Sequence, residues 1–215
     1  NVLQKIDLTQ SCPNCNISTW DAIVDVMYEN TTQTVWVAYY DTDYAIGNDR
    51  IKSGVLKFNL SGTLLGNWTQ NTSNVSNFMH SPQYFYRGSK DGFTYLGFWA
   101  GNVTEKNSSN DWINISKGIA KINVTNGSFG FIPLFGININ GSLDDQGPVY
   151  MKFGSDDYLY VAFYHVAFGG VPNAVYVVNV TNMSVVRSFS NSSNWIRAIA
   201  LFFDENDDLW LGGRS

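Results

Sequence analysis

One short stretch, residues 54–62, constrains the fold more than any other part of the sequence because it recurs. It reads Gly-Val-Leu-Lys-Phe-Asn-Leu-Ser-Gly, a β-prone run followed by side chains that bond nearby backbone groups in turns. Related versions of it stand at three other places: residues 2–9, 118–125 and 174–181. The spacing is 64 residues from Asn59 to Asn123 and 56 residues from Asn123 to Asn179. Internal repeats of this length predict propeller blades or solenoid units.

A second repeated element is a hairpin whose second strand is rich in aromatic residues. In each copy, polar turn residues separate two apolar, β-prone runs, which is the pattern of a β-hairpin. The predicted hairpins cover residues 21–40, 80–100, 147–167 and 196–215. A last strand is expected after the three internal copies of the first stretch, at residues 63–70, 128–136 and 183–190. Each complete unit is therefore predicted to hold four antiparallel strands.

This order of strands resembles the blades of a β-propeller, and the resemblance covers the whole chain as an architecture. It implies a single all-β domain over residues 1–215, a four-bladed β-propeller-like domain of four-stranded antiparallel units. The units are expected at about 20–70, 80–136, 147–190 and 195–215, the last of them completed by residues 1–9. An incomplete fourth unit would leave an unpaired strand edge, which invites pairing. Residues 1–9 either close the ring of their own chain, which the short linker favours, or fill the gap in a neighbouring copy.

Composition excludes several classes of protein. Charged residues are 14% of the chain and the net charge is −5, whereas a nucleic-acid surface needs clustered Lys and Arg. No run of 18 or more apolar residues is present, so no membrane-spanning helix is expected. The chain does not start with a charged and then apolar segment, so we expect any signal peptide to have been removed.

Asn-X-Ser/Thr sequons are the densest motif in the chain and begin at 15 of its 24 asparagines. Ser and Thr make up about a sixth of the residues, so chance alone would give roughly four sequons. The sequons fall in predicted turns and loops and begin at Asn16, Asn30, Asn59, Asn67, Asn71, Asn74, Asn102, Asn107, Asn114, Asn123, Asn126, Asn140, Asn179, Asn182 and Asn191. The pattern indicates a secreted or cell-surface protein whose covalent N-glycans provide the hydration that charge provides elsewhere. The alternative is a loop composition that is merely rich in Asn, Ser and Thr.

Cys12 and Cys15 are the two cysteines of the chain. In a secreted protein such a pair predicts one structural disulfide, whose effect on stability is modest because the loop it closes is short. A redox pair of the C-x-x-C type would need a preceding strand and a following helix, and a metal site would need further ligands. Pairing between two chains is the remaining alternative.

Histidine and acidic residues provide few candidates for catalysis. His80 and His165 are the two histidines, and no serine nucleophile motif accompanies them, which argues against a catalytic triad. The turn at residues 204–208 could bind Ca²⁺, although its position matches three other hairpin turns and favours a plain polar turn. Paired carboxylates for glycoside hydrolysis could come from four aspartates, namely Asp21, Asp25, Asp144 and Asp145.

Two loops are candidates for contact surfaces. Residues 101–117 are predicted as the longest loop and contain three sequons, so they form either a glycan-shielded surface or a binding loop. Residues 163–172 are apolar, rich in glycine and without a sequon, so they form either an exposed contact surface or a loop folded over its own unit.

Together these patterns favour a structural role, as a subunit of an extracellular or cell-surface assembly such as a filament or surface layer. The low charge and the dense sequons resemble the external proteins of thermoacidophilic archaea, which are often coated in this way. The expected partner is the chain itself, in a homopolymer or surface assembly, with no nucleic acid and no membrane span. We expect no enzymatic activity and no cofactor apart from the covalent N-glycans. Two alternatives stay open: a secreted binding module, lectin-like or adhesin, and a glycosidase-type enzyme.

Overall fold

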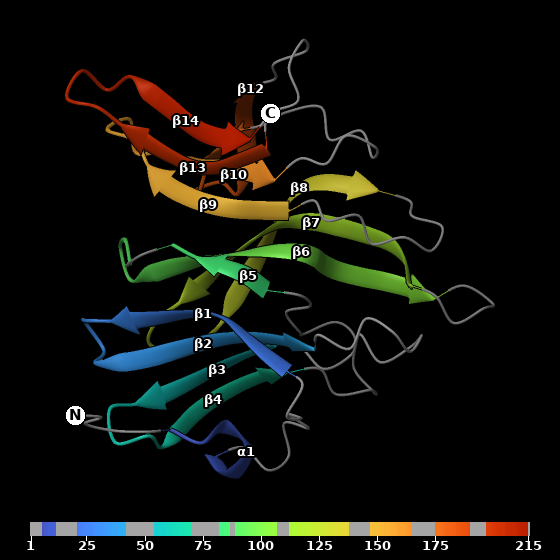
Figure 1. Cartoon of the computed structure of the whole chain (residues 1–215), viewed down its shortest axis with the longest axis vertical. Helices are drawn as coiled ribbons and strands as arrows, with labels where there is room; N and C mark the ends of the chain where they lie inside the picture. The colour runs from blue at the N-terminus through green and yellow to red at the C-terminus, as the bar shows by residue number, and fades with distance from the viewer. Residues whose placement is uncertain are drawn as a thin grey trace.

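The computed structural model of the protein describes nine stretches of the chain: residues 6–11, 21–41, 54–69, 82–86, 89–106, 112–137, 147–164, 175–189 and 197–214. Over these residues the protein is all-β, with four antiparallel sheets and one short helix, α1 (Leu8–Ser11). Figure 1 shows the sheets stacked one upon another along the long axis, in the order in which the chain forms them. No helix in these nine stretches is long and apolar enough to cross a membrane.

The first two sheets hold four strands each. The first sheet consists of β1 (Asp21–Glu29), β2 (Thr34–Asp41), β3 (Gly54–Asn59) and β4 (Leu64–Thr69). The second sheet consists of β5 (Pro82–Phe85), β6 (Phe93–Lys106), β7 (Trp112–Asn123) and β8 (Phe129–Ile137). In both, each strand pairs antiparallel with the next one along the chain.

The third sheet repeats this order with β9 (Gly147–Phe153), β10 (Leu159–Tyr164), β11 (Val175–Asn179) and β12 (Ser184–Phe189). The fourth sheet, as described, consists of β13 (Arg197–Phe203) and β14 (Leu209–Arg214). The predicted antiparallel units are therefore confirmed as sheets of an all-β protein. Within the described part of the chain β14 pairs with β13 alone, and no sheet closes on itself.

Strand β3 shows why the sheets must be stacked, because its first five residues are all buried. A strand covered on one face alternates buried and exposed residues, whereas a strand covered on both faces is buried continuously. Val55 belongs to a core cluster shared with the second sheet, while Leu56 and Phe58 belong to a cluster on the opposite face. Strand β11 of the third sheet has four consecutive buried residues for the same reason. The continuous apolar runs of the repeat thus lie between two layers.

The turns between strands also repeat. In all four hairpins the same position near the end of the turn has a positive φ, and it is occupied by Gln33, Gly92, Asp157 and Asp207. Between the third and fourth strands that conformation is taken by Gly62, Gly127 and Met183. At Gly127, where φ is 73°, an added Cβ would lie 1.9 Å from a ring carbon of Trp68. Both the backbone and the packing therefore require glycine at that turn.

The prediction of a long loop at residues 101–117 is wrong for most of that range. Strand β6 continues to Lys106 and β7 begins at Trp112, so the hairpin extends beyond β8, whose last residue, Ile137, pairs with Ile115. The register pairs Val103 with Ile115. β-Branched residues on both strands favour extended backbone, and this preference outweighs the Asn and Ser residues that suggested a loop.

The N-terminal segment does not complete the fourth sheet as predicted. Residues 6 and 7 are outside any strand, and the backbone N–H of Gln10 in α1 donates to Oδ1 of Asp7 at 3.4 Å. Ile6 and Leu8 pack against a buried cluster of β2 and β3 in the first sheet. Figure 1 places α1 beside that sheet, at the opposite end of the stack from β13 and β14. The described part of this segment covers apolar surface of the first sheet instead of pairing with β14, so ring closure by residues 1–9 is wrong for residues 6–9.

Candidate functional site

The buried polar chemistry of the described residues is concentrated at the junction of the first and second sheets. Four buried polar side chains bond across it: Asp25, Glu29, Lys57 and Thr94. Burying a polar group costs free energy unless it is hydrogen-bonded, so each of them needs its partner on the neighbouring sheet. The fifth buried polar side chain, Thr34, shares a hydrogen bond with Thr32 in the adjacent turn.

Lys57 in β3 is the centre of this first junction. Its Nζ donates to the backbone oxygens of Val124 at 2.6 Å and Thr125 at 3.0 Å, in the turn that follows β7. The ammonium also lies 5.0 Å from the ring centre of Trp36, within the range of a cation–π interaction. Burial lowers the pKa of Lys57, and the negative charge of Glu29 works in the opposite direction. A buried cation is thus held by two carbonyl oxygens and an aromatic ring.

Lys121 repeats this arrangement one junction further along the stack. It has the same place in β7 that Lys57 has in β3, and its Nζ donates to the backbone oxygen of Val180 at 2.8 Å. The Nζ atom lies 4.3 Å from the ring centre of Phe93. Sequence analysis did not identify either lysine as functional, although their recurrence at one position of the repeat was a signal that could have found them.

Glu29 ties the first junction from the turn between β1 and β2. Its Oε1 accepts from the backbone N–H of Thr31 and from Oγ of Ser89 on the second sheet, both at 3.0 Å. Its Oε2 accepts from the backbone N–H and the hydroxyl of Thr32, both at 2.6 Å. Burial works to raise the pKa of Glu29, but these hydrogen bonds outweigh it and lower the pKa from 4.5 to about 2. The carboxylate therefore stays charged until the pH is strongly acidic.

Asp25 is the carboxylate candidate for glycoside chemistry whose contacts the structure describes. Its Oδ1 accepts from the backbone N–H of Val26 at 2.9 Å, and its Oδ2 accepts from the backbone N–H of Phe85 at 2.8 Å. One oxygen thus holds the backbone of its own strand β1 and the other holds that of β5, which gives Asp25 a structural role at the first junction. The side chain of Asp21 is not among those described, and Asp144 and Asp145 lie outside the described residues.

The second junction carries an ion pair between Lys90 and Asp157. The Nζ atom of Lys90 lies 4.4 Å from the ring centre of Phe153. That ring packs edge-on against Tyr86 and Tyr95 of the second sheet. Cation, carboxylate and aromatic rings again connect two sheets, here near the hairpin turns.

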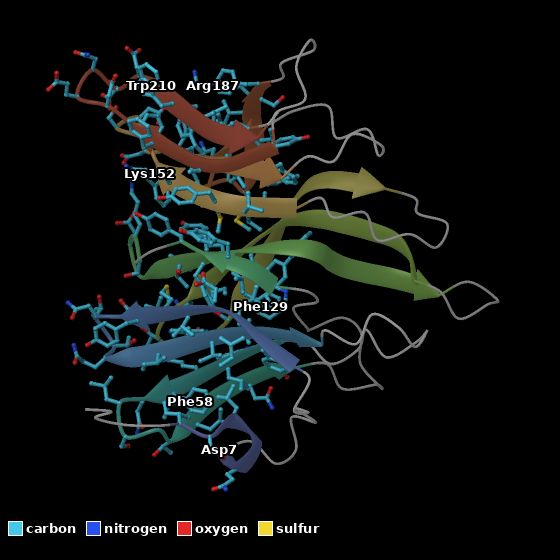
Figure 2. All side chains as sticks on the ribbon, in the orientation of Figure 1. Asp7, Phe58, Phe129, Lys152, Arg187 and Trp210 are labelled. Carbon is cyan, nitrogen blue, oxygen red and sulfur yellow. The ribbon has the colours of Figure 1, made fainter. Side chains whose placement is uncertain are left out.

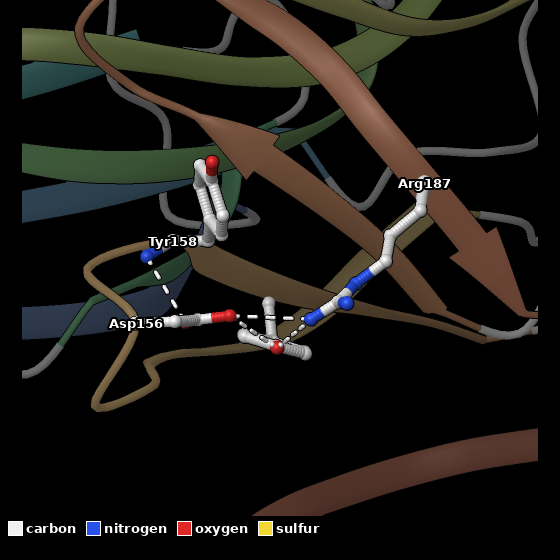
Figure 3. Close-up of polar contacts among 4 residues, drawn as sticks. Asp156, Tyr158 and Arg187 are labelled. Atoms are coloured by element: carbon white, nitrogen blue, oxygen red, sulfur yellow. Dashed lines mark hydrogen bonds and ion pairs between the residues drawn. The ribbon is translucent and has the colours of Figure 1, made fainter.

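The third sheet takes its cation from a different strand. Val177 in β11 stands where a lysine stands in the two earlier copies, and it pairs across the sheet with Arg187 in β12. Nη2 of Arg187 donates to the hydroxyl of Tyr160 at 2.5 Å and to Oδ2 of Asp156 at 3.2 Å. The tyrosine hydroxyl donates to the same carboxylate oxygen at 2.8 Å. Figure 3 shows this cluster beside the turn that joins β9 and β10.

Tyr160 is as buried as Lys57, whereas Arg187 is open to water. Burial raises the pKa of Tyr160, Asp156 raises it further, and Arg187 works to lower it. The phenol is therefore protonated at neutral pH and acts as a hydrogen-bond donor, not as a base. The side chain of Arg187 is 50% exposed, so its guanidinium keeps contact with solvent.

Three sequon asparagines end the third strands of the first three sheets: Asn59, Asn123 and Asn179. Their Oδ1 atoms accept backbone N–H groups of Thr63, Thr125 and Thr181 at 2.8, 2.9 and 2.9 Å. Asp204 makes a similar bond in the turn between β13 and β14, accepting from the N–H of Asn206 at 2.9 Å. These are turns closed by an Asn or Asp side chain. Turn chemistry alone therefore favours asparagine at these three sequons.

Six more sequon asparagines lie in the described residues. Three of them, Asn30, Asn126 and Asn182, are exposed in turns. The prediction of turns and loops is wrong for Asn102 and Asn114, which lie within β6 and β7, whereas Asn67 lies in β4, inside the strand predicted at residues 63–70. The sequons at Asn16, Asn71, Asn74, Asn107, Asn140 and Asn191 begin outside the described residues. Glycosylation at all fifteen positions stays a prediction.

The acidic turn at residues 204–208 uses its first carboxylate within the hairpin. Oδ2 of Asp204 accepts from Nε1 of Trp210 at 2.9 Å, and this bond lowers the pKa of Asp204. Over the nine described stretches no group of three or more His, Cys, Asp or Glu residues could hold a metal ion. Cys12, Cys15, His80, His165 and residues 165–172 of the apolar loop lie outside those stretches.

Comparison with known proteins gives no family. No protein-family model matches the chain, and no curated protein matches it by sequence. Among solved structures it is similar to a protein of unknown function from Bacteroides caccae, with 14% identity, a TM-score of 0.40 and coverage of 91% of this chain. It is also similar to the extracellular domain of a candidate one component system from B. thetaiotaomicron, with 14% identity, a TM-score of 0.36 and coverage of 88% of this chain. The chain spans 57% of the first of these structures and 26% of the second.

Proposed function

We propose that the chain is a structural subunit of an extracellular, heavily N-glycosylated assembly, with its sheets arranged as propeller-like units. The observation that carries this proposal is the use of the buried polar side chains. Asp25, Glu29, Lys57 and Thr94 each make at least one hydrogen bond that joins the first sheet to the second. Such bonds hold neighbouring sheets together in one relative position, and a structural scaffold needs this rigidity.

The contacts between first strands support the propeller-like arrangement. Strand β1 contacts β5, β5 contacts β9, and β9 contacts β13, so the strand that opens each sheet lies against the strand that opens the next. In a propeller the corresponding strands line the central axis. The proposed arrangement is therefore a propeller-like order of four units in which the first and fourth sheets stay apart, at opposite ends of the stack in Figure 1.

The sequons support the extracellular part of the proposal unequally. Turn chemistry already explains the asparagines that close the third strands. Those three sequons therefore do not distinguish a glycosylated protein from one with asparagine-rich turns. Asn67 lies in the middle of β4, where no turn calls for asparagine, and its side chain is exposed. Asn30, Asn126 and Asn182 are also exposed and accessible to a modifying enzyme.

Protein purified from its native source tests the proposal. Intact mass before and after deglycosylation, followed by peptide mapping, should find glycan at Asn67 and at most of the other exposed sequons. Electron microscopy of the native particles should show ordered assemblies. If fewer than about half of the sequons carry glycan, the proposal of a heavily N-glycosylated assembly is wrong. Dispersed single particles in a native extract would remove the structural assembly.

A further inference from the structure

Both ends of the stack expose apolar positions that are buried at every junction inside it. The repeat places one equivalent residue in the second strand of each sheet: Trp36, Tyr95, Tyr160 and Trp210. The first three are 0%, 1% and 5% exposed because the next sheet covers them, whereas Trp210 is 55% exposed. Its ring stacks on that of Phe202, itself 51% exposed, with the ring centres 6.2 Å apart. The outward face of the fourth sheet therefore presents an uncovered aromatic pair.

The first sheet shows the complementary feature on its outer face. One position of the first strand pairs in the same register with the second strand in all four sheets, and its occupants are Val26, Phe85, Met151 and Leu201. The last three are 0%, 3% and 1% exposed, whereas Val26 is 45% exposed. Ile23 and Tyr28 pair with residues of the same face of β2 and are exposed as well.

The internal junctions show which face covers which. At each of them the Trp36 position of one sheet lies in a core with the Val26 position of the next sheet. The three pairings are Trp36 with Phe85, Tyr95 with Met151, and Tyr160 with Leu201. The molecule thus contains three examples of the contact that its two end faces would make with each other.

We propose that the β13–β14 face of one copy packs on the β1 face of a second copy, in a head-to-tail contact. This inference rests on the proposed structural role and names its partner as the chain itself. Figure 2 shows Trp210 at one end of the stack and Phe58 and Asp7 at the other, so one copy cannot supply both faces of the same contact. Because the two faces differ, the contact is heterologous and continues from copy to copy unless the rotation closes a ring.

The N-terminal segment leaves one part of the first sheet's outer face uncovered. Ile6 and Leu8 already cover the part of the first sheet formed by β2 and β3. The exposed residues Ile23, Val26 and Tyr28 all lie on β1, which leaves the part next to the first strand open. The β13–β14 face can therefore lie against β1 without displacing the N-terminal segment.

Two charge substitutions, each on one face, test the contact in the full chain. Sedimentation equilibrium of the unaltered protein, with and without its glycans, should give a mass that rises with concentration. Trp210→Lys and Val26→Lys should each raise the dissociation constant at least about tenfold, because each buries a charge against apolar residues. An equimolar mixture of the two variants keeps one intact contact and should form dimers but nothing larger.

Leu65→Lys is the matched control, since Leu65 lies on β4 with 53% exposure and is separated from β1 by two strands of the sheet. It should associate as the unaltered protein does, and the thermal midpoints of all three variants should show that they fold. A protein that stays monomeric at millimolar concentration would overturn the inference. So would a mixture of Trp210→Lys and Val26→Lys that gives no dimers, or a Leu65→Lys variant that is weakened equally. None of these results would contradict the glycosylation part of the proposed function. Conversely, unoccupied sequons would not contradict the head-to-tail contact.

Discussion

The first and last junctions of the stack hold their sheets together by different means. Across the first, Glu29 and Lys57 are buried and bond to groups of the second sheet. At the last, the shared core is apolar and aromatic, with Tyr160 edge-on to Phe203 at 4.8 Å between ring centres. The cation of the third sheet, Arg187, is half exposed and bonds within its own sheet.

The number of strands in the covering sheet explains this difference. Lys57 is buried because the second sheet has a third strand, and the turn after that strand offers two carbonyl oxygens. The fourth sheet, as described, has two strands, so no such turn faces Val177. A buried charge without partners costs several kcal/mol. An apolar residue in β11 with a cation at the surface is therefore the more stable arrangement at the last junction.

The largest expected effect is that of Lys57→Met. It removes the donor of two carbonyl oxygens, one of them in a buried bond, and a cation that interacts with Glu29, so the free energy of unfolding should fall by about 3 kcal/mol. Lys121→Met, with one carbonyl partner and a less buried cation, should cost about half as much. Urea unfolding at neutral pH measures both. Equal losses for the two variants would show that carbonyl partners do not set the strength of a junction.

A second substitution introduces a buried lysine, as found at the first junction, into the last junction. Val177→Lys puts an ammonium on a fully buried position that faces the fourth sheet, which has no third strand, and no turn after one, among the described residues. We expect the free energy of unfolding, measured with urea, to fall by about 2–3 kcal/mol. The cost is no larger because the lysine stem can extend and bring the ammonium toward solvent. Val177→Met is the control for size and should cost less than about 1.5 kcal/mol. A stable Val177→Lys protein would mean that acceptors lie within reach after all.

The third prediction concerns pH at the first junction. The pKa of Glu29 is lowered to about 2 in the folded protein, below its ordinary value of 4.5. Its contribution to stability is therefore fully present above pH 4.5 and is lost as the pH falls toward 2. Glu29→Gln should cost about 2 kcal/mol at pH 7 and much less at pH 2, as measured by urea unfolding at both values. Glu205→Gln, on an exposed turn, is the control and should change neither value. A Glu29→Gln loss that is the same at both pH values would contradict the assignment.

The repeat pattern was enough to predict the antiparallel units but not their connections. Alternating and continuous apolar runs predict strands because burial on one or two faces decides which residues a strand can hold. Residues 101–106 and 112–117 were predicted as loop because their Asn and Ser residues are common in turns, yet they pair as strands. The N-terminal copy of the repeat was predicted as a strand, but Leu8–Ser11 form α1 against the first sheet. The secondary structure of such segments depends on the surface against which they pack. A single sequence does not show which surface that is.

The junction residues were harder to predict than the strands. Lysine at the same position of two copies was visible, but its carbonyl partners lie 67 and 59 residues away in the chain. Arg187 was harder still to predict, because it lies on the neighbouring strand and not at the lysine position of the repeat. Partners at such distances become evident only when the stacking of the sheets is known.

The smallest expected effect is that of Arg187→Met. Its pair with Asp156 is partly exposed, and ion pairs of that kind contribute about 0–1 kcal/mol because water screens them. We expect a loss of about 0.5 kcal/mol in urea unfolding, several times smaller than for Lys57→Met. A double-mutant cycle with Asp156→Asn separates the pair from the other contacts of each residue and should give a coupling energy below about 1 kcal/mol. A coupling energy above about 2 kcal/mol would show that the cation of the last junction is as strongly held as Lys57, and the strand count of the covering sheet would then no longer account for the contrast.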